Sequence, residues 1–256
     1  MKDLFENNNE VSRRDVLRGV GIAVAGTAIA AVAGSSIIST AEAKSTSKSF
    51  GYKKLDVDAV GWTAYENYGK VFCAQTVVGA LAGELSREVG GQWKTYPVES
   101  AFWGHGGITG WGTACGTLIG AGTVVGLALE DKKLAESVVN DIMAYYAYTN
   151  LPVYSPRKIV ITDIKFRSKA ETPLCHVSVG KWMKKENVKF FSDARKERCG
   201  RIAADIAMHT ATLLNQVADG TYKSGHAINA KTYGITAQEN CTECHGKDVP
   251  TPPTQG

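Results

Sequence analysis

Near its C-terminus the chain carries two cysteines and a histidine in the order Cys241-Thr-Glu-Cys244-His245. This C-x-x-C-H pattern is the one by which c-type haem is attached. Two thiols at this spacing can add across the two vinyl groups of one haem, and the imidazole that follows can reach the iron from one face. A zinc site would need a second cysteine pair, and the sequence has no other C-x-x-C. The motif therefore predicts covalent haem on Cys241 and Cys244, with His245 as the proximal iron ligand.

Four further cysteines are scattered through the chain: Cys73, Cys115, Cys175 and Cys199. Two disulfides would be ordinary in an exported protein. A metal centre is the alternative, because Cys115, Cys175 and Cys199 are expected at or near helix N-termini, where backbone N–H groups and the helix dipole stabilise thiolates. Cys73 is expected inside a helix. The spacing leaves two disulfides and four-cysteine ligation of an iron–sulfur cluster both open, since it matches no ferredoxin pattern.

The N-terminal residues 1–43 have the features of an export signal. Arg13 and Arg14 precede an uncharged stretch, residues 19–40, and Ala41-Glu42-Ala43 supplies small residues for cleavage. The arginine pair indicates the twin-arginine type, which carries folded proteins, commonly ones that take up a cofactor in the cytoplasm. A retained membrane anchor is the alternative, since the apolar stretch is long enough to span. We expect cleavage, a periplasmic location and no stable membrane insertion afterwards.

The elements that must position these residues are predicted to be mainly helices. Apolar residues recur at helical spacing in five segments, and alternation in a sixth predicts one short strand. A glycine-rich run can only be a loop, because it needs backbone angles that glycine alone adopts freely. The predicted helices span residues 62–89, 113–129, 131–149, 176–184 and 188–214, the loop residues 104–112 and the strand residues 158–166. The predicted fold class is therefore mainly α. It has a helical body, residues 44–220, that carries the four-cysteine site, followed by a C-terminal c-type haem-binding segment, residues 221–256.

The charge of the chain excludes one class of function. The formal net charge is +4 at pH 7, and the basic residues are spread out, without a basic stripe interleaved with aromatic residues. Nucleic-acid binding therefore has no support. A mild basic excess is compatible with an acidic redox partner.

The sequences around the cysteines resemble a known family. The motifs are Cys73-Ala-Gln, "TACGTLIGAG", "PLCHVSVGKW", "ERCGRIAADIA" and the terminal "CTECH". Together they resemble the split-Soret cytochromes c of sulfate-reducing bacteria, and the wider group with a C…GCAxxG…C…C pattern, over essentially the whole mature chain. Ala114 stands where that pattern has glycine, and Gly120 follows Cys115 by five residues instead of four. These departures bear on the local turn more than on the ligand.

The resemblance implies two cofactors and a homodimer. Each chain would carry one haem c and one iron–sulfur cluster, either [2Fe–2S] or [4Fe–4S]. The cluster would be bound by Cys73, Cys115, Cys175 and Cys199. The two haems of the dimer would lie together near its interface, each with two histidine ligands, one of them from the partner chain.

The sixth haem ligand has four candidates. His105, in the glycine-rich loop, and His176, beside Cys175, are expected to surround the cluster without binding the haem iron. His209 falls on the apolar face of a predicted helix, where a core histidine is the ordinary role. His226 lies in a flexible polar segment close in sequence to the haem motif, with no apolar pattern to explain it. We therefore favour His226, from this chain or from the partner chain, as the distal ligand, with His209 as the alternative.

The leading functional hypothesis is an electron carrier, because haem and cluster in one chain form a short relay and two histidine ligands leave the iron no open position. One alternative is a haem enzyme with an open iron position, such as a small-oxyanion reductase or a peroxidase. The sequence shows no clear acid/base pair beside the haem motif, so no catalytic residue is assigned. A haem- or redox-responsive binding protein is the third alternative. The redox partners, the cluster type and the reduction potentials are not encoded in any motif.

Overall fold

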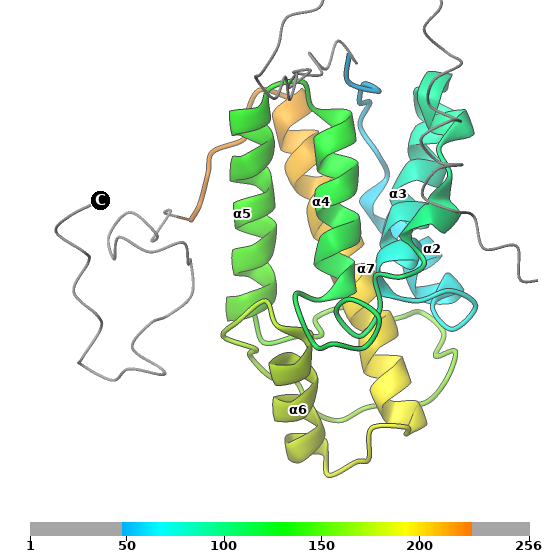
Figure 1. Ribbon diagram of the computed structural model, residues 1–256, viewed down its shortest axis with the longest axis vertical. Coiled ribbons are helices and arrows are strands. Elements are labelled where there is room, and N and C mark those ends of the chain that lie inside the picture. The colour runs from blue at the N-terminus through cyan, green and yellow to red at the C-terminus, as the bar shows by residue number, and fades with distance from the viewer. Residues whose placement is uncertain (1–47, 227–256) are drawn as a thin grey trace, which may run out of the picture. The chain divides into compact units, whose positions relative to one another are not determined.

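The computed structural model describes residues 48–226, which contain all four scattered cysteines. The predicted signal and the motif Cys241, Cys244 and His245 lie outside the described residues. Within the described part the chain forms six α-helices, and the regular structure is helical throughout (Figure 1). They are α2 (Val57–Asn67), α3 (Cys73–Glu88), α4 (Gly116–Ala128), α5 (Lys132–Tyr148), α6 (Cys175–Glu186) and α7 (Asp193–Ala218), with short 3-10 helices η2 (Gly91–Thr95) and η3 (Val98–Ala101). The predicted mainly α class is confirmed.

Helix α7 is the central element of the bundle. It contacts α2, α3, α4 and α5, and its buried face carries Ile202, Ile206, Ala207, Ala211 and Leu214. The helix begins at Asp193, because the Ser192 hydroxyl accepts a hydrogen bond from the Arg195 amide at 3.2 Å. The start is later than the predicted residue 188. Asn187 closes α6 in a left-handed conformation, and residues 188–192 form the connection.

The first predicted helix, residues 62–89, is wrong as a single element. Helix α2 ends at Asn67 and α3 begins at Cys73, with an irregular link between them. Gly69 in this link has φ 107°, a backbone angle that favours glycine. The apolar spacing runs across the break because both helices bury one face in the same core. The break makes Cys73 the first residue of a helix rather than an interior one.

The predicted strand, residues 158–166, is also wrong. The segment is irregular, and its backbone amides bond to side chains rather than to a neighbouring strand. The Val160 amide donates to the Tyr65 hydroxyl at 2.9 Å, and the Lys165 and Phe166 amides donate to the Glu186 carboxylate at 3.1 and 2.9 Å. Among the described residues there is no strand for this segment to pair with, so side chains of α2 and α6 accept the hydrogen bonds of its backbone amides.

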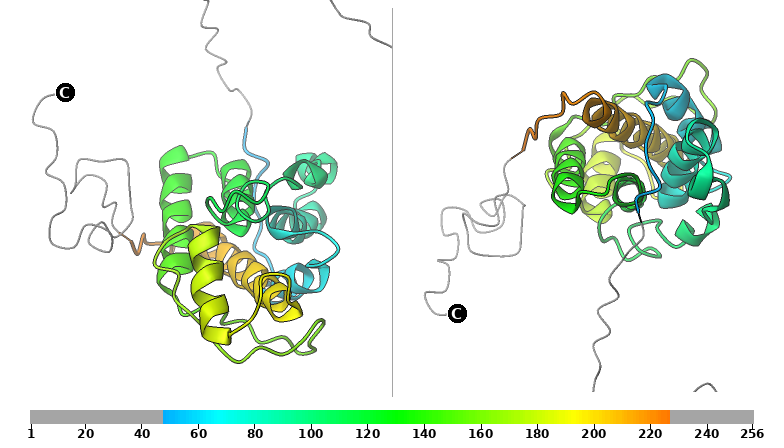
Figure 2. Two further views of the ribbon diagram at one scale, coloured as in Figure 1. Left: turned by 60° about the horizontal axis from the view of Figure 1, so that its bottom comes forward. Right: turned by 90° about the horizontal axis from the view of Figure 1, so that it is seen from above.

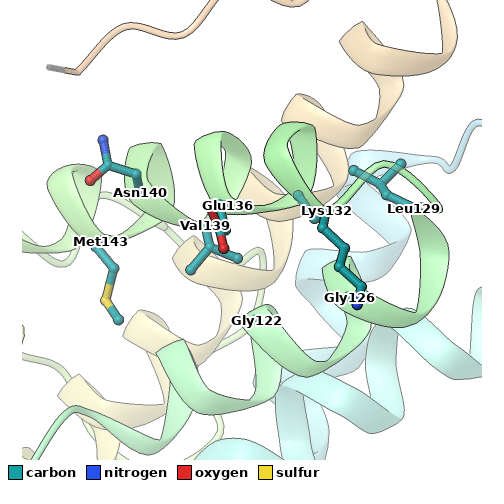
Figure 3. Close-up of a pocket in the computed structure, with 9 residues that line it drawn as sticks. Gly122, Gly126, Leu129, Lys132, Glu136, Val139, Asn140 and Met143 are labelled. Atoms are coloured by element: carbon teal, nitrogen blue, oxygen red, sulfur yellow. The ribbon is translucent and has the colours of Figure 1, made fainter. Parts of the chain in front are cut away.

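The small residues of α4 allow close packing on one of its sides and leave a groove on the other. A Cβ on Gly120 would lie 2.6 Å from the Ala74 carbonyl oxygen, so α3 and α4 touch through their backbones. On the opposite side a groove of about 470 Å³ separates α4 from α5 (Figure 3). The groove is lined by Gly122, Gly126, Leu129, Lys132, Ala135, Glu136, Val139, Asn140 and Met143.

In the described part of the chain, no helix combines the length and the apolar character that crossing a bilayer requires.

Candidate functional site

The four cysteines gather at one end of the helical bundle. The N-terminal ends of α3, α4 and α7 point toward the end where α6 lies (Figure 1), and the left view of Figure 2 brings this end forward. Cys73 is the first residue of α3, Cys115 is the N-cap of α4, Cys175 is the first residue of α6, and Cys199 lies in the second turn of α7. Three of the four are therefore at helix N-termini, as predicted, but Cys73 takes the place expected for Cys199.

Backbone hydrogen bonds join the starts of α4 and α6. The Cys115 amide donates to the Pro173 carbonyl at 2.9 Å, and the Cys175 amide donates to the Thr113 carbonyl at 2.8 Å. This reciprocal pair forms an isolated antiparallel bridge between the two segments. It holds the Cys115 and Cys175 side chains next to each other, although sixty residues separate them in sequence.

Cys73 is brought to the same place by the glycine-rich loop. The Ala74 amide donates to the Gly104 carbonyl at 2.9 Å, which ties the start of α3 to the loop. A Cβ on Gly116 would lie 2.6 Å from the Cys73 Cβ, so the starts of α3 and α4 are in direct contact. Cys73 itself has φ 35°, a conformation that residues other than glycine rarely adopt. Backbone strain of this kind concentrates at functional sites.

The two histidines predicted to surround the cysteines do lie at this end. His176 follows Cys175 on α6, and its amide donates to the Gly112 carbonyl at 3.2 Å. Gly112 has φ 73°, and a Cβ there would lie 2.7 Å from the His176 Cβ. The loop therefore needs glycine both for its turn and for its close approach to α6. His105 is exposed on the same loop.

The helices that start at the cysteines share a second feature. Helices α2, α5 and α7 are capped by the side chains of Asp56, Asp131 and Ser192. Helices α3, α4 and α6 have no side-chain cap. Some of their first N–H groups donate to backbone carbonyls instead, as the Ala74, Cys175 and His176 amides do. Sulfur is a further acceptor for such amides. The Gly106 amide hydrogen-bonds to Cys73 and the Thr117 amide to Cys115.

The four scattered cysteines carry free thiols, and neighbouring groups shift the pKa values of Cys73, Cys115 and Cys175. A hydrogen bond from the Cys175 thiol lowers the pKa of Cys115 to about 6, helped by Thr117, whose hydroxyl lies 3.2 Å from the Cys115 sulfur. The same hydrogen bond, together with burial, raises the pKa of Cys175. Burial, together with the neighbouring Cys115 and Cys199, raises the pKa of Cys73 to about 12. These thiols therefore lie near enough to share one site, and the two-disulfide alternative is absent from the described residues.

The arrangement differs from a mononuclear metal site. Among residues 48–226, no set of three or more His, Cys, Asp or Glu side chains is placed to hold a single metal ion. A tetrahedral ion needs its sulfurs within roughly 4 Å of one another, because each lies about 2.3 Å from the metal. In an iron–sulfur cluster, iron and sulfide lie between the thiolates and hold them further apart. The four free cysteines supply thiols at one end of the bundle, where four helices position them.

The sequence analysis missed three buried polar residues next to the cysteines: Tyr146, Ser178 and Arg198. Tyr146, on α5, is 1% exposed and hydrogen-bonds to Cys115 and to Ser178. Burial raises its pKa well above the usual range. Arg198, directly before Cys199, is also 1% exposed, and its Nη2 donates to the Ser178 hydroxyl at 2.9 Å. The burial of Arg198 could have been predicted from its position, because it lies one turn before Ile202 on the apolar face of the same helix.

The two candidate sixth haem ligands line one cavity. This histidine cavity measures about 330 Å³ and is lined by Asp141, Ala144, Tyr145, Tyr148, His209, Leu213, Lys223, Gly225 and His226. His209 stacks on Tyr145 with ring centroids 3.9 Å apart and planes 13° apart. Burial lowers the pKa of His209 to about 4, which keeps its imidazole neutral. His226 lies with its ring 5.6 Å from that of Tyr148.

His226 is held in place, contrary to its predicted location in a flexible segment. Its amide donates to the Asp141 carboxylate at 2.9 Å, and its carbonyl accepts from the Asn140 side chain at 2.9 Å. The Gly225 amide and the Tyr222 hydroxyl donate to the same carboxylate at 3.0 and 2.8 Å. A carboxylate in the middle of α5 therefore anchors the chain where it leads toward the C-x-x-C-H motif. His226 is also the last described residue.

Comparison with known proteins identifies the relatives of this chain. Residues 71–213 match the model of the family described as redox-active protein (C_GCAxxG_C_C), a range that includes all four scattered cysteines. The split-Soret cytochrome c of Desulfovibrio desulfuricans is 30% identical over 92% of this chain and 87% of its own length. A solved structure, described as showing a novel iron centre in that cytochrome, has a TM-score of 0.65 and covers 77% of this chain and 82% of its own. The chain therefore belongs to the split-Soret cytochrome c family, whose members are redox proteins of electron transfer.

Proposed function

We propose that the protein is a periplasmic electron carrier in which each chain of a homodimer holds one c-type haem and one iron–sulfur cluster. The observation that carries the proposal is the gathering of four free cysteines at one end of the bundle. They come from four helices, α3, α4, α6 and α7, and lie far apart in sequence. The relative with the solved structure is described as having an iron centre.

The residues at the cysteine end fit an anionic metal cluster. Cys73, Cys115, Cys175 and Cys199 would bind it, and the lowered pKa of Cys115 already favours one thiolate. The uncapped starts of α3, α4 and α6 direct partial positive charge toward this end, which favours further thiolates. The cluster, when bound, supplies a redox couple at this end of the bundle. The protein residues set its position, its solvent access and the charge around it.

The haem end fits a six-coordinate carrier. Haem c would be attached to Cys241 and Cys244 with His245 as the proximal ligand. His226, from this chain or from the partner chain, would be the distal ligand, and His209 remains the alternative because both line the histidine cavity. Two histidine ligands leave no position for a substrate, which favours a carrier over a haem enzyme.

The two ends of the proposed relay are joined by consecutive residues of α5. Tyr146 contacts the cysteine end through Cys115, and Tyr145 stacks on His209 in the histidine cavity. Helix α7 links the same ends, because Cys199 and His209 are ten residues apart, about 15 Å at 1.5 Å per residue. These two links support a relay in which electrons would cross only a short distance between the proposed cofactors.

The small size of the haem segment supports the proposed homodimer. Residues 227–256 are too few to form a core around a haem by themselves, since such short pieces lack apolar area. The haem must then be covered by the helical body or by a second chain. A two-fold dimer meets the need with one patch, because each chain gives and receives the same contact. The name of the relative, which refers to a split Soret band, supports paired haems.

Metal and haem analysis of the purified, exported full-length protein tests the proposal. We expect one covalent haem per chain, non-haem iron with acid-labile sulfide, a sedimentation mass of two chains and a haem spectrum that carbon monoxide does not change. Cys241→Ala combined with Cys244→Ala should abolish covalent haem staining in a denaturing gel while non-haem iron remains. Protein without acid-labile sulfide, or with the four scattered cysteines joined as disulfides in mass mapping, would refute the cluster. A haem that binds carbon monoxide would favour the enzyme.

A further inference from the structure

Arg198 places a full positive charge in the protein interior without an acidic partner. Its side chain is 1% exposed, and its guanidinium lies 5.5 Å above the centre of the Trp182 ring. Its Nη2 donates to the Ser178 hydroxyl, a neutral group, at 2.9 Å. Its Nε has no acceptor among the described residues. A buried charge with only neutral partners is costly, so such groups normally face an opposite charge.

The acidic groups near Arg198 on α7 are engaged elsewhere. Glu197 accepts from the Arg201 guanidinium at 2.7 Å and from the Tyr65 hydroxyl at 2.8 Å. Asp205 accepts from the Val153 and Tyr154 amides at 2.9 and 2.7 Å. Within the described residues, neither carboxylate lies within ion-pair distance of Arg198, although the Arg198 charge acts on Asp205 and lowers the pKa of that carboxyl against the larger effect of its burial. The elements packed against the guanidinium contribute Ser178 and Trp182 from α6, which are neutral.

A hydrogen-bonded path leads from Arg198 to the cysteine end. Arg198 donates to Ser178, Ser178 bonds to Tyr146, and Tyr146 bonds to the sulfur of Cys115. Arg198 is also directly followed by Cys199. The Arg198 charge is therefore linked to two candidate ligands, to Cys115 through Ser178 and Tyr146 and to Cys199 through the backbone. A cluster held by four thiolates is a net anion, since thiolates and sulfides together outweigh the charge of the irons.

We propose that Arg198 is the buried counter-charge of the four-cysteine centre, which retains the anionic cluster and raises its reduction potential. The inference rests on the proposed function, because it needs a cluster at this end. The reduced cluster carries one more negative charge than the oxidised one, so a fixed cation stabilises the reduced form more. The low dielectric of the interior makes this effect larger than for an exposed lysine, whose field water screens.

The test is a redox titration of the non-haem iron centre in the full-length holoprotein, followed by electron paramagnetic resonance. Arg198→Met keeps most of the side-chain length and removes the charge. We expect its ratio of reduced to oxidised cluster at fixed potential to fall by about tenfold, which is a shift of about 59 mV for a one-electron couple. Arg198→Lys should stay near the wild-type potential. Lys196→Met removes an exposed charge from the same helix and should change the ratio by less than Arg198→Met does.

The possible outcomes show whether Arg198 acts on the cluster through its charge or through its packing. An Arg198→Met protein that keeps its full cluster and the wild-type potential would overturn the proposal. If Arg198→Met binds no cluster, Arg198→Lys decides: recovery of iron, sulfide and potential supports the counter-charge, and failure to recover them shows that the side chain acts by packing. A wild-type protein without non-haem iron and sulfide would instead refute the cluster itself, and with it the proposed function.

Discussion

Gly116 is the position where one added methyl group should separate the cysteines. It is the first residue of α4, directly after Cys115, and it is buried. A Cβ there would collide with the Gly104 carbonyl oxygen, which already accepts the Ala74 amide, and would lie 2.6 Å from the Cys73 Cβ. Both neighbours belong to the contact that brings the starts of α3 and α4 together. Gly116→Ala must therefore push Cys73 and Cys115 apart.

The stability change expected for Gly116→Ala can be compared with that for another glycine of the same helix. Gly126 is exposed on α4, and nothing lies within 4 Å of a Cβ built there. Gly126→Ala should stabilise the protein by up to about 1 kcal/mol, the difference in helix propensity between glycine and alanine. Gly116→Ala meets backbone atoms that cannot rotate away, and overpacking of this kind costs about 1–3 kcal/mol. The two substitutions are chemically identical and should have opposite signs.

Urea unfolding and metal analysis measure the two consequences separately. We expect Gly116→Ala to lower the unfolding midpoint and to lose non-haem iron, whereas Gly126→Ala should raise the midpoint and keep the iron. Equal stability and equal iron content in the two variants would refute the packing of α3 against α4 described above. A Gly116→Ala protein that is less stable but fully loaded would show that the cluster tolerates a displacement of Cys73.

Three further predictions follow from the site. Serine in place of any one of the four scattered cysteines should reduce non-haem iron and destabilise the body, since ligation and folding are coupled; unchanged iron in all four variants would exclude them as ligands. His226→Ala should change the haem spectrum and weaken the dimer in sedimentation, whereas a spectral change only in His209→Ala would assign the ligand to α7. Burial raises the pKa of Asp205 from 3.8 to about 7, so the fold favours its protonated form. Its stabilising contribution is present below pH 4 and is lost as the pH rises to 7, by up to about 1.4 kcal/mol per pH unit. His209, whose pKa burial lowers to about 4, adds a slope of opposite sign between about pH 4 and 6.5. Asp205→Asn should therefore make the slope of the free energy of unfolding against pH more positive by up to about 1.4 kcal/mol per pH unit between pH 4 and 7, and an unchanged slope would contradict the assignment.

The sequence by itself determined the fold class and the identity of the reactive residues. Helices α4, α5 and α6 lie within a few residues of their predicted ranges, because amphipathic spacing and terminal residues act locally. The positions of Cys115 and Cys175 at helix starts were predictable for the same reason. The haem motif is defined within five consecutive residues, so no tertiary information is needed to recognise it.

Only the tertiary structure decided how these residues meet. The break at Gly69 that turns Cys73 into a helix start is hidden in the sequence, because two helices that face one core keep a continuous apolar rhythm. The burial of Arg198 and the anchoring of His226 by Asp141 depend on contacts between segments far apart in the chain. Periodicity reports which face of an element is buried, but it does not report which distant side chain lies opposite. The cysteine end and the histidine cavity are therefore products of packing, built on helices that the sequence specifies locally.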